Sequence, residues 1–179
     1  MIVLDSNNKN NKLDITFLDW IKFVLSFRYI SNISIVVAVL AYWMQAYEVF
    51  FICIPLIITN FVGFVLLTIF DLDKYMQGIL GRVTNDLEVI NSYKPHFVIF
   101  NIIWHTVPLF WIYSVLTREN LVQLFRPNFM SMFLKSALVA IVYFYYERDI
   151  EPYGKVDYLW YFIVYMMVLF GSNVFVYLE

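Results

Sequence analysis

The stretch that decides the fold is FVIFNIIWHTVPLFWIYSVL, Phe97–Leu116, which contains no charged side chain. A helix of this length is about 30 Å long, the thickness of the hydrocarbon core of a bilayer. Asn101, His105 and Pro108 nevertheless lie in its middle, and their spacing of i, i+4 and i+7 places them on one face of a helix. The stretch therefore predicts a transmembrane helix whose polar face is turned toward other helices.

The composition of the chain indicates that other stretches have the same character. Of the 179 residues, 62% are hydrophobic and only 15% are charged, whereas a soluble domain is nearer half apolar and a quarter charged. In water such a chain would expose large apolar patches, so we expect membrane lipids as its surroundings. The formal net charge of −2 provides no field that would attract nucleic acid, and we expect no nucleic-acid partner.

Hydropathy along the chain divides it into a tail and one membrane domain. Residues 1–13 are polar, show no signal-peptide pattern and are expected to form a mobile tail, and residues 14–179 are expected to form a single transmembrane helical domain. We predict an all-α, polytopic helical bundle of about five spans, near 29–47, 49–70, 97–116, 129–146 and 158–178.

Two further segments have the spacing of amphipathic helices. In residues 14–28 a narrow polar stripe predicts a helix in the membrane surface, or else an extension of the first span. In residues 71–94 the apolar positions keep helical spacing, which predicts a second surface helix. Asp71 and Asp73 begin that segment. They could hold a divalent cation, but we favour a role as helix caps and as partners of the helix dipole, and we expect no metal site.

Small residues in the predicted spans indicate where helices pack closely. They lie on one face of the first span, midway along the second and within the fourth. Small side chains allow the backbones of neighbouring helices to approach each other in lipid. The residues that we expect to pack in this way are Ser31, Ser34, Ala38, Ala41 and Gln45, then Gly63, then Ser136 and Ala140.

The distribution of Lys and Arg predicts the orientation. With five spans, the side that holds the N-terminus, the 71–95 connection and the 147–157 turn carries most of these residues. The positive-inside rule then predicts a cytoplasmic N-terminus and a C-terminus on the opposite side. Because this face mixes acidic and basic side chains, it is where we expect a protein partner. The alternative is that its charges only keep the loops soluble.

Polar side chains inside the spans form the candidate site. The expected cluster comprises Asn60, Asn101, His105, Thr106 and Lys135. An ionisable group deep in a membrane suggests function by default, because it needs a partner there. His105 is expected to be uncharged, and it could act as a base, a ligand or a proton relay. It could equally link helices by donating a hydrogen bond to Thr59, Asn60 or a Tyr hydroxyl. Because no second His or Cys accompanies His105 in this cluster, the case for a metal site is weak, and we expect no cofactor.

The run Asn101-x-x-x-His105-Thr106-x-Pro108 resembles a helix of the androgen-induced family of integral membrane hydrolases. That family cleaves fatty-acid esters with a Thr nucleophile and a His. The resemblance covers some ten residues and implies that His105 is the catalytic base. By the same analogy the nucleophile would be Thr59 or Thr68.

The run from Asn101 to Leu109, in a chain rich in Asn, Ile, Tyr and Phe, is also similar to multi-span proteins of large DNA viruses that have an internal membrane. This similarity implies a structural or assembly role beneath a capsid. Because no complete catalytic constellation is present, we expect a non-catalytic protein that shapes or scaffolds a membrane or anchors partners. The alternatives are a lipid-ester hydrolase that uses His105 and a span Thr, and a small-solute carrier.

Overall fold

The computed structural model describes residues 29–81, 87–119, 121, 123, 126–150, 153 and 155–178. Every element bounded within this part of the chain is a helix, and the predicted all-α class is confirmed. The elements are α2 (Ile30–Trp43), α3 (Tyr47–Phe70), α4 (Leu72–Leu80), α5 (Leu87–Ser92), α6 (Lys94–Glu119), the 3-10 turn η1 (Arg126–Asn128), α8 (Phe129–Ile150) and α9 (Tyr158–Leu178). The predicted tail 1–13 and surface helix 14–28 lie outside the described residues.

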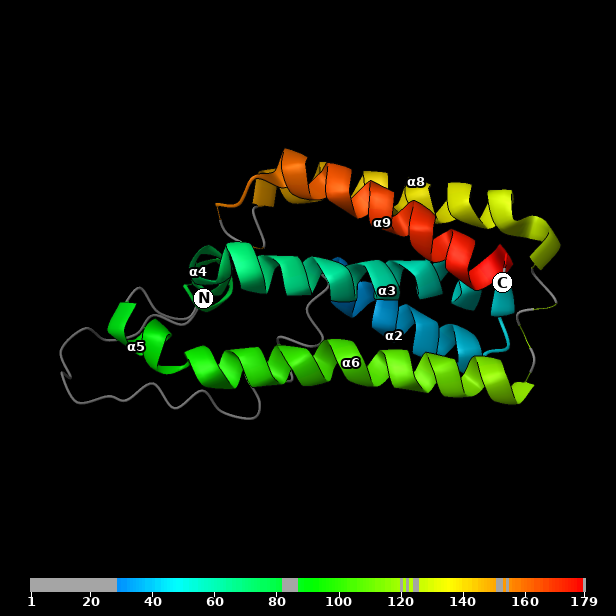
Figure 1. Cartoon of the computed structure of the whole chain (residues 1–179), viewed down its shortest axis with the longest axis horizontal. Coiled ribbons are helices and arrows are strands. Elements are labelled where there is room, and N and C mark those ends of the chain that lie inside the picture. Colours follow the sequence, from blue (N-terminus) through cyan, green and yellow to red (C-terminus); the bar gives the residue numbers. More distant parts are fainter. Residues whose placement is uncertain are drawn as a thin grey trace.

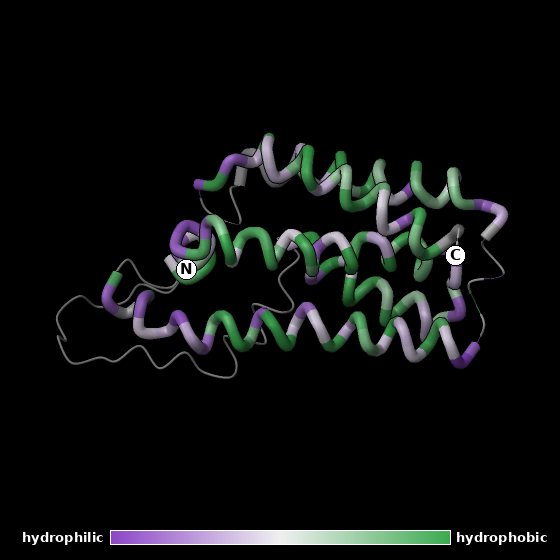
Figure 2. The backbone as a smooth tube through the Cα atoms, viewed as in Figure 1, coloured by the Kyte–Doolittle hydropathy of each residue, from purple (hydrophilic) through white to green (hydrophobic). Residues whose placement is uncertain are grey.

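Four of these helices are long and apolar enough to cross a membrane: Tyr47–Phe70, Lys94–Glu119, Phe129–Tyr146 and Tyr158–Val176. Their outward faces carry large apolar side chains, among them Ile103 and Phe110 on α6 and Leu138 on α8. Figure 2 shows hydrophilic residues gathered toward the two ends of the bundle and hydrophobic residues between them. The chain is therefore a multi-helix integral membrane protein, because only lipid solvates such an exterior.

The first predicted span is shorter than expected. Helix α2 has 14 residues, about 21 Å at 1.5 Å per residue, and covers only part of the length of α3 (Figure 1). It ends in a turn where Gln45 has a φ of 58°. The Gln45 and Ala46 N–H groups bond the carbonyls of Tyr42 and Ala41, which is the pattern of a Schellman motif. The prediction that Gln45 continues the packed helical face is wrong.

Helix α3 lies at the centre of the bundle and contacts α2, α4, α6, α8 and α9. Helices α8 and α9 lie on one side of it, and α2 and α6 on the other (Figure 1). In an apolar stretch of 18 residues in α3, 56% is buried, against 28% in the corresponding stretch of each of the other three long helices. The outer helices therefore face lipid, and α3 holds them together.

The connection after α3 forms two short helices, where the sequence predicted one. Helices α4 and α5 are separated by Gly81 and by residues 82–86, which lie outside the described part of the chain. Gly81 follows the last residue of α4, and a Cβ there would meet the Gln77 carbonyl oxygen at 2.2 Å. The apolar face of α4 packs into the core through Tyr75, Met76, Ile79 and Leu80.

The small residues differ in their surroundings. Helix α2 buries its small residues, Ser31, Ser34, Ala38 and Ala41, and Ser136 and Ala140 of α8 are fully buried. Gly63 is different, because a Cβ built on it would meet nothing within 4 Å. No neighbouring backbone approaches Gly63 closely, and open space lies beside it.

Candidate functional site

A chain of hydrogen bonds crosses three helices in the middle of the bundle. Tyr165 of α9 donates its hydroxyl to Oδ1 of Asn60 at 2.9 Å. The Asn60 amide donates to Oγ of Ser34 on α2 at 2.9 Å, and that hydroxyl donates to the carbonyl of Ser31 at 3.0 Å. All four residues are buried. These bonds tie α2, α3 and α9 together in the interior of the bundle.

Two further polar contacts attach α6 to its neighbours. The Trp104 indole N–H donates to Oδ1 of Asn32 on α2 at 3.0 Å. Tyr75 of α4 donates its hydroxyl to Oδ1 of Asn101 at 3.2 Å, while the Asn101 amide donates to the Phe97 carbonyl at 2.8 Å. Burial raises the pKa of Tyr75, so its hydroxyl keeps the proton that it donates. Asn101 thus joins α4 to α6.

Charged groups meet at the end of the bundle near α4. Asp71 accepts hydrogen bonds from Lys74 at 2.8 Å and from the hydroxyl of Tyr161 at 3.0 Å. Asp73 pairs with Lys94 at 2.9 Å. The bond from Lys74 lowers the pKa of Asp71. Asp71 occupies the N-cap position of α4 and Asp73 lies in its first turn, but the Asp71 side chain makes no cap hydrogen bond. The two carboxylates instead join α4 to α9 and α6.

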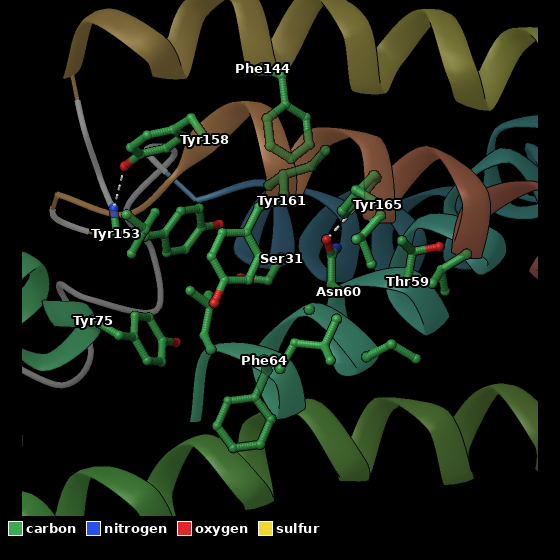
Figure 3. A pocket seen from close by; sticks show the side chains of 18 of the residues that line it. Ser31, Thr59, Asn60, Phe64, Tyr75, Phe144, Tyr153, Tyr158, Tyr161 and Tyr165 are labelled. Atoms are coloured by element: carbon green, nitrogen blue, oxygen red, sulfur yellow. Dashed lines mark hydrogen bonds between the residues drawn. The ribbon is translucent and has the colours of Figure 1, made fainter. Parts of the chain in front are cut away.

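A partly open cavity of about 60 Å³ lies between α3 and α9, beside the N-terminal end of α2. Its polar lining comes mainly from tyrosines, several of which are seen in Figure 3. Apolar side chains make up most of the remaining wall. The lining includes Ser31, Thr59, Asn60, Tyr75, His105, Tyr153, Tyr158, Tyr161 and Tyr165, with Val62, Gly63, Phe64, Leu66, Phe144, Val164 and Val168.

His105 reaches this cavity from α6, and only 5% of its surface is exposed. Its ring lies flat against Phe64, with centroids 4.9 Å apart and an angle of 10° between the planes. Within the described part of the chain no hydrogen bond joins the ring to another residue. The expected bond from His105 to Thr59, Asn60 or a Tyr hydroxyl is therefore not present there. Packing against Phe64 holds the imidazole in place.

The other predicted site residues lie in different places. Thr59 and Asn60 line the same cavity as His105. The Thr59 hydroxyl donates to the Pro55 carbonyl of its own helix at 2.7 Å. Thr106 is half-buried and does not line the cavity. Lys135 is 44% exposed and pairs with Glu48 at the outside of the bundle, so its polar contact joins α8 to α3 away from the cavity.

Sequence reasoning missed the tyrosines of the cavity. Tyr158, Tyr161 and Tyr165 are spaced at i, i+3 and i+7, so they share one face of α9. That spacing could have been recognised, but in a chain with 14 Tyr it does not stand out. The role of Trp104 as a donor to Asn32 depends on the packing of α6 against α2, which no local pattern reveals.

Comparison with protein-family models, with curated proteins and with solved structures finds no match for this chain. Among the described residues, no three His, Cys, Asp or Glu side chains lie together where they could hold a metal ion.

Proposed function

We propose that this protein is a structural component of its membrane, with a scaffolding or assembly role and no catalytic activity. The observation that supports this proposal is the use of the buried polar groups. Ser34, Asn60 and Tyr165 bond one another across three helices, and Trp104 bonds Asn32 across two. These groups hold the helices in place, because they are already hydrogen-bonded to one another. A chain built in this way would supply a rigid apolar body that organises lipids and other proteins around it.

The charged end of the bundle is the surface that we propose for a protein partner. Asp73 is 70% exposed, and Lys74 is 58% exposed. Lys155 and Asp157 are exposed at the same end of the bundle, before α9. Orientation by the positive-inside rule would place this end in the cytoplasm. One setting that fits such a role is the internal membrane of a large DNA virus, to whose multi-span proteins the run from Asn101 to Leu109 is similar.

Charge reversal tests the partner surface. We expect chemical cross-linking in the native membrane to capture a protein with the wild-type chain. Lys74→Glu combined with Lys155→Glu should abolish that product. The matched control reverses Arg118 and Lys135, which are exposed toward the other end of the bundle, and should leave the product unchanged. Retention of the product by the first pair, or its loss in the control alone, would contradict the proposal.

A lipid-ester hydrolase is the second candidate, because His105 and Thr59 line one cavity. In this reaction the imidazole would accept the proton of the Thr59 hydroxyl as its oxygen attacks an ester carbonyl. The hydroxyl now donates to the Pro55 carbonyl at 2.7 Å. It would have to rotate toward His105 before it could act. The structural role needs no such rearrangement, which is why we rank it first.

An assay in vesicles separates the two candidates. The wild-type protein is reconstituted with a fluorogenic ester lipid, beside His105→Ala and Thr59→Val. Thr117→Val is the control, because Thr117 is exposed on α6 and lies outside the cavity. The structural proposal expects ester release at the level of protein-free vesicles in all four samples. Release by the wild type and the control that is lost in the other two variants would establish the hydrolase.

A further inference from the structure

The His105 ring is a polar group in the bundle interior that lines the cavity. Only 5% of its surface is exposed, and one face of the ring lies against Phe64. No hydrogen bond to it occurs within the described residues, yet a neutral imidazole carries one donor and one acceptor. A buried polar group without a partner is unfavourable. Because the ring lines a cavity, that partner can come from a bound molecule.

The cavity wall favours an uncharged molecule that is mostly apolar. Valine, leucine and aromatic side chains form most of the lining, and no Lys or Arg is among the described residues that line it. Asp71 is an ionised group that bonds to the lining: it accepts a hydrogen bond from the hydroxyl of Tyr161 at 3.0 Å. Asp71 is already paired with Lys74 at 2.8 Å, so a carboxylate or phosphate entering here would find no cation among the described lining residues. A hydroxyl group needs no such cation and can still bond an imidazole.

The volume limits how much of a molecule enters. About 60 Å³ is several times the space that one water needs. It is well below the 150 Å³ of an apolar cavity known to hold benzene. The cavity thus admits one end of a chain and leaves the rest outside, which its partly open shape allows.

We propose that this cavity is a binding site for an uncharged membrane lipid of the long-chain alcohol type, whose hydroxyl bonds the His105 ring. The first methylene groups would lie against Val62, Val164 and Val168, and the remainder of the chain would extend into the bilayer. Binding at this site involves no chemical reaction and is independent of the structural role proposed above. It would make the stability of the bundle depend on the lipid composition of its membrane.

Gly63 offers a way to fill the cavity without disturbing a contact. It lines the cavity, and a Cβ there would meet nothing within 4 Å. Gly63→Leu should therefore place a side chain in the space that the ligand uses. Gly171→Leu is the matched control, because Gly171 also has nothing within 4 Å of its Cβ but is exposed on α9 outside the cavity. Replacing Gly by Leu favours the helix in both variants.

The test uses photolabelling in phosphatidylcholine vesicles. The probe is a long-chain primary alcohol with a diazirine close to its hydroxyl, and a fatty acid with the same diazirine is the charged counterpart. We expect the alcohol to label the peptides that contain residues 59–67 and 161–168. His105→Phe keeps an aromatic ring against Phe64 and should weaken that labelling about tenfold, the effect of one lost hydrogen bond. Gly63→Leu should abolish it, and Gly171→Leu should match the wild type.

Three results would overturn the proposal. They are labelling of the lining peptides that Gly63→Leu and His105→Phe leave unchanged, equal labelling by the fatty acid, and labelling spread over the lipid-facing helices without enrichment at the lining. If a variant fails to fold, the test is competition on the wild-type protein, in which unlabelled alcohol is added with the photolabel. Loss of signal under competition supports the site, and an unchanged signal refutes it.

Discussion

Replacing Tyr165 with Phe removes one oxygen atom from the bundle interior. The lost hydroxyl is the donor to Asn60 Oδ1 at 2.9 Å. The phenyl ring can keep its packing against Phe144, whose centroid lies 5.0 Å away. The variant therefore isolates one polar contact between α3 and α9 from the apolar packing around it. If such contacts stabilise this fold, the free energy of unfolding must fall.

The size of the effect follows from two terms. A hydrogen bond between membrane helices is worth about 0.6 kcal/mol on average and about 1.7 kcal/mol at most. An acceptor left without a partner in the interior adds a penalty of about 1–3 kcal/mol. Asn60 lines the cavity, so a water molecule there could replace the lost donor and reduce that penalty. We expect Tyr165→Phe to lower the unfolding free energy by about 0.5–1.5 kcal/mol.

Equilibrium unfolding by SDS in mixed micelles measures this difference. Tyr113→Phe is the control, because Tyr113 is 69% exposed on α6, and its effect should stay within about 0.5 kcal/mol. A double-mutant cycle with Asn60→Ala then isolates the pair, with an expected coupling of about 0.6–1.7 kcal/mol. If Tyr165→Phe unfolds no more easily than Tyr113→Phe and the coupling is zero, buried polar contacts do not hold the helices together, and the argument for the structural role fails.

Three further predictions test packing, charge and topology. Ala140 is fully buried in α8, so Ala140→Leu should overpack the interface and lower stability by about 1–3 kcal/mol in the same assay; a neutral result would mean that α8 can shift. The bond from Lys74 places the pKa of Asp71 below its ordinary 3.8, so its carboxylate stabilises the fold above that pH, and the contribution is lost as the pH falls through the folded pKa. Acid titration should therefore destabilise the wild type more than Asp71→Asn, and equal losses would show that the pair is irrelevant. Reporters fused to the two termini should respond on opposite sides of the membrane, the N-terminal one in the cytoplasm, and a shared compartment would refute the five-span scheme.

Long apolar stretches made the helices predictable. A segment of some twenty residues without charge must satisfy its backbone hydrogen bonds internally in lipid, and a helix does so with local bonds alone. Helices α6, α8 and α9 accordingly cover the predicted stretches. Prediction failed at the ends of elements, where single bonds decide. The turn at Gln45 and the break after α4 depend on carbonyl partners that hydropathy does not reveal.

The candidate site was predictable only in part. The spacing of Asn101, His105 and Pro108 predicted one shared face, and all three residues are buried. Their partners come from other helices and could not be read from α6. Tyr75 bonds Asn101, while Phe64 covers His105. Lys135 has an exposed partner in Glu48, which lies 87 positions away in the sequence.

By itself the sequence determined that this chain is a bundle of apolar helices in lipid, because composition and periodicity are properties of each segment alone. The tertiary structure decided which polar groups bond one another, that Thr59 and His105 share a cavity without a bond between them, and that space is left beside Gly63. The physical reason is distance along the chain. A hydrogen bond such as that from Tyr165 to Asn60 joins residues 105 positions apart, and only the packing of α9 against α3 brings them within reach.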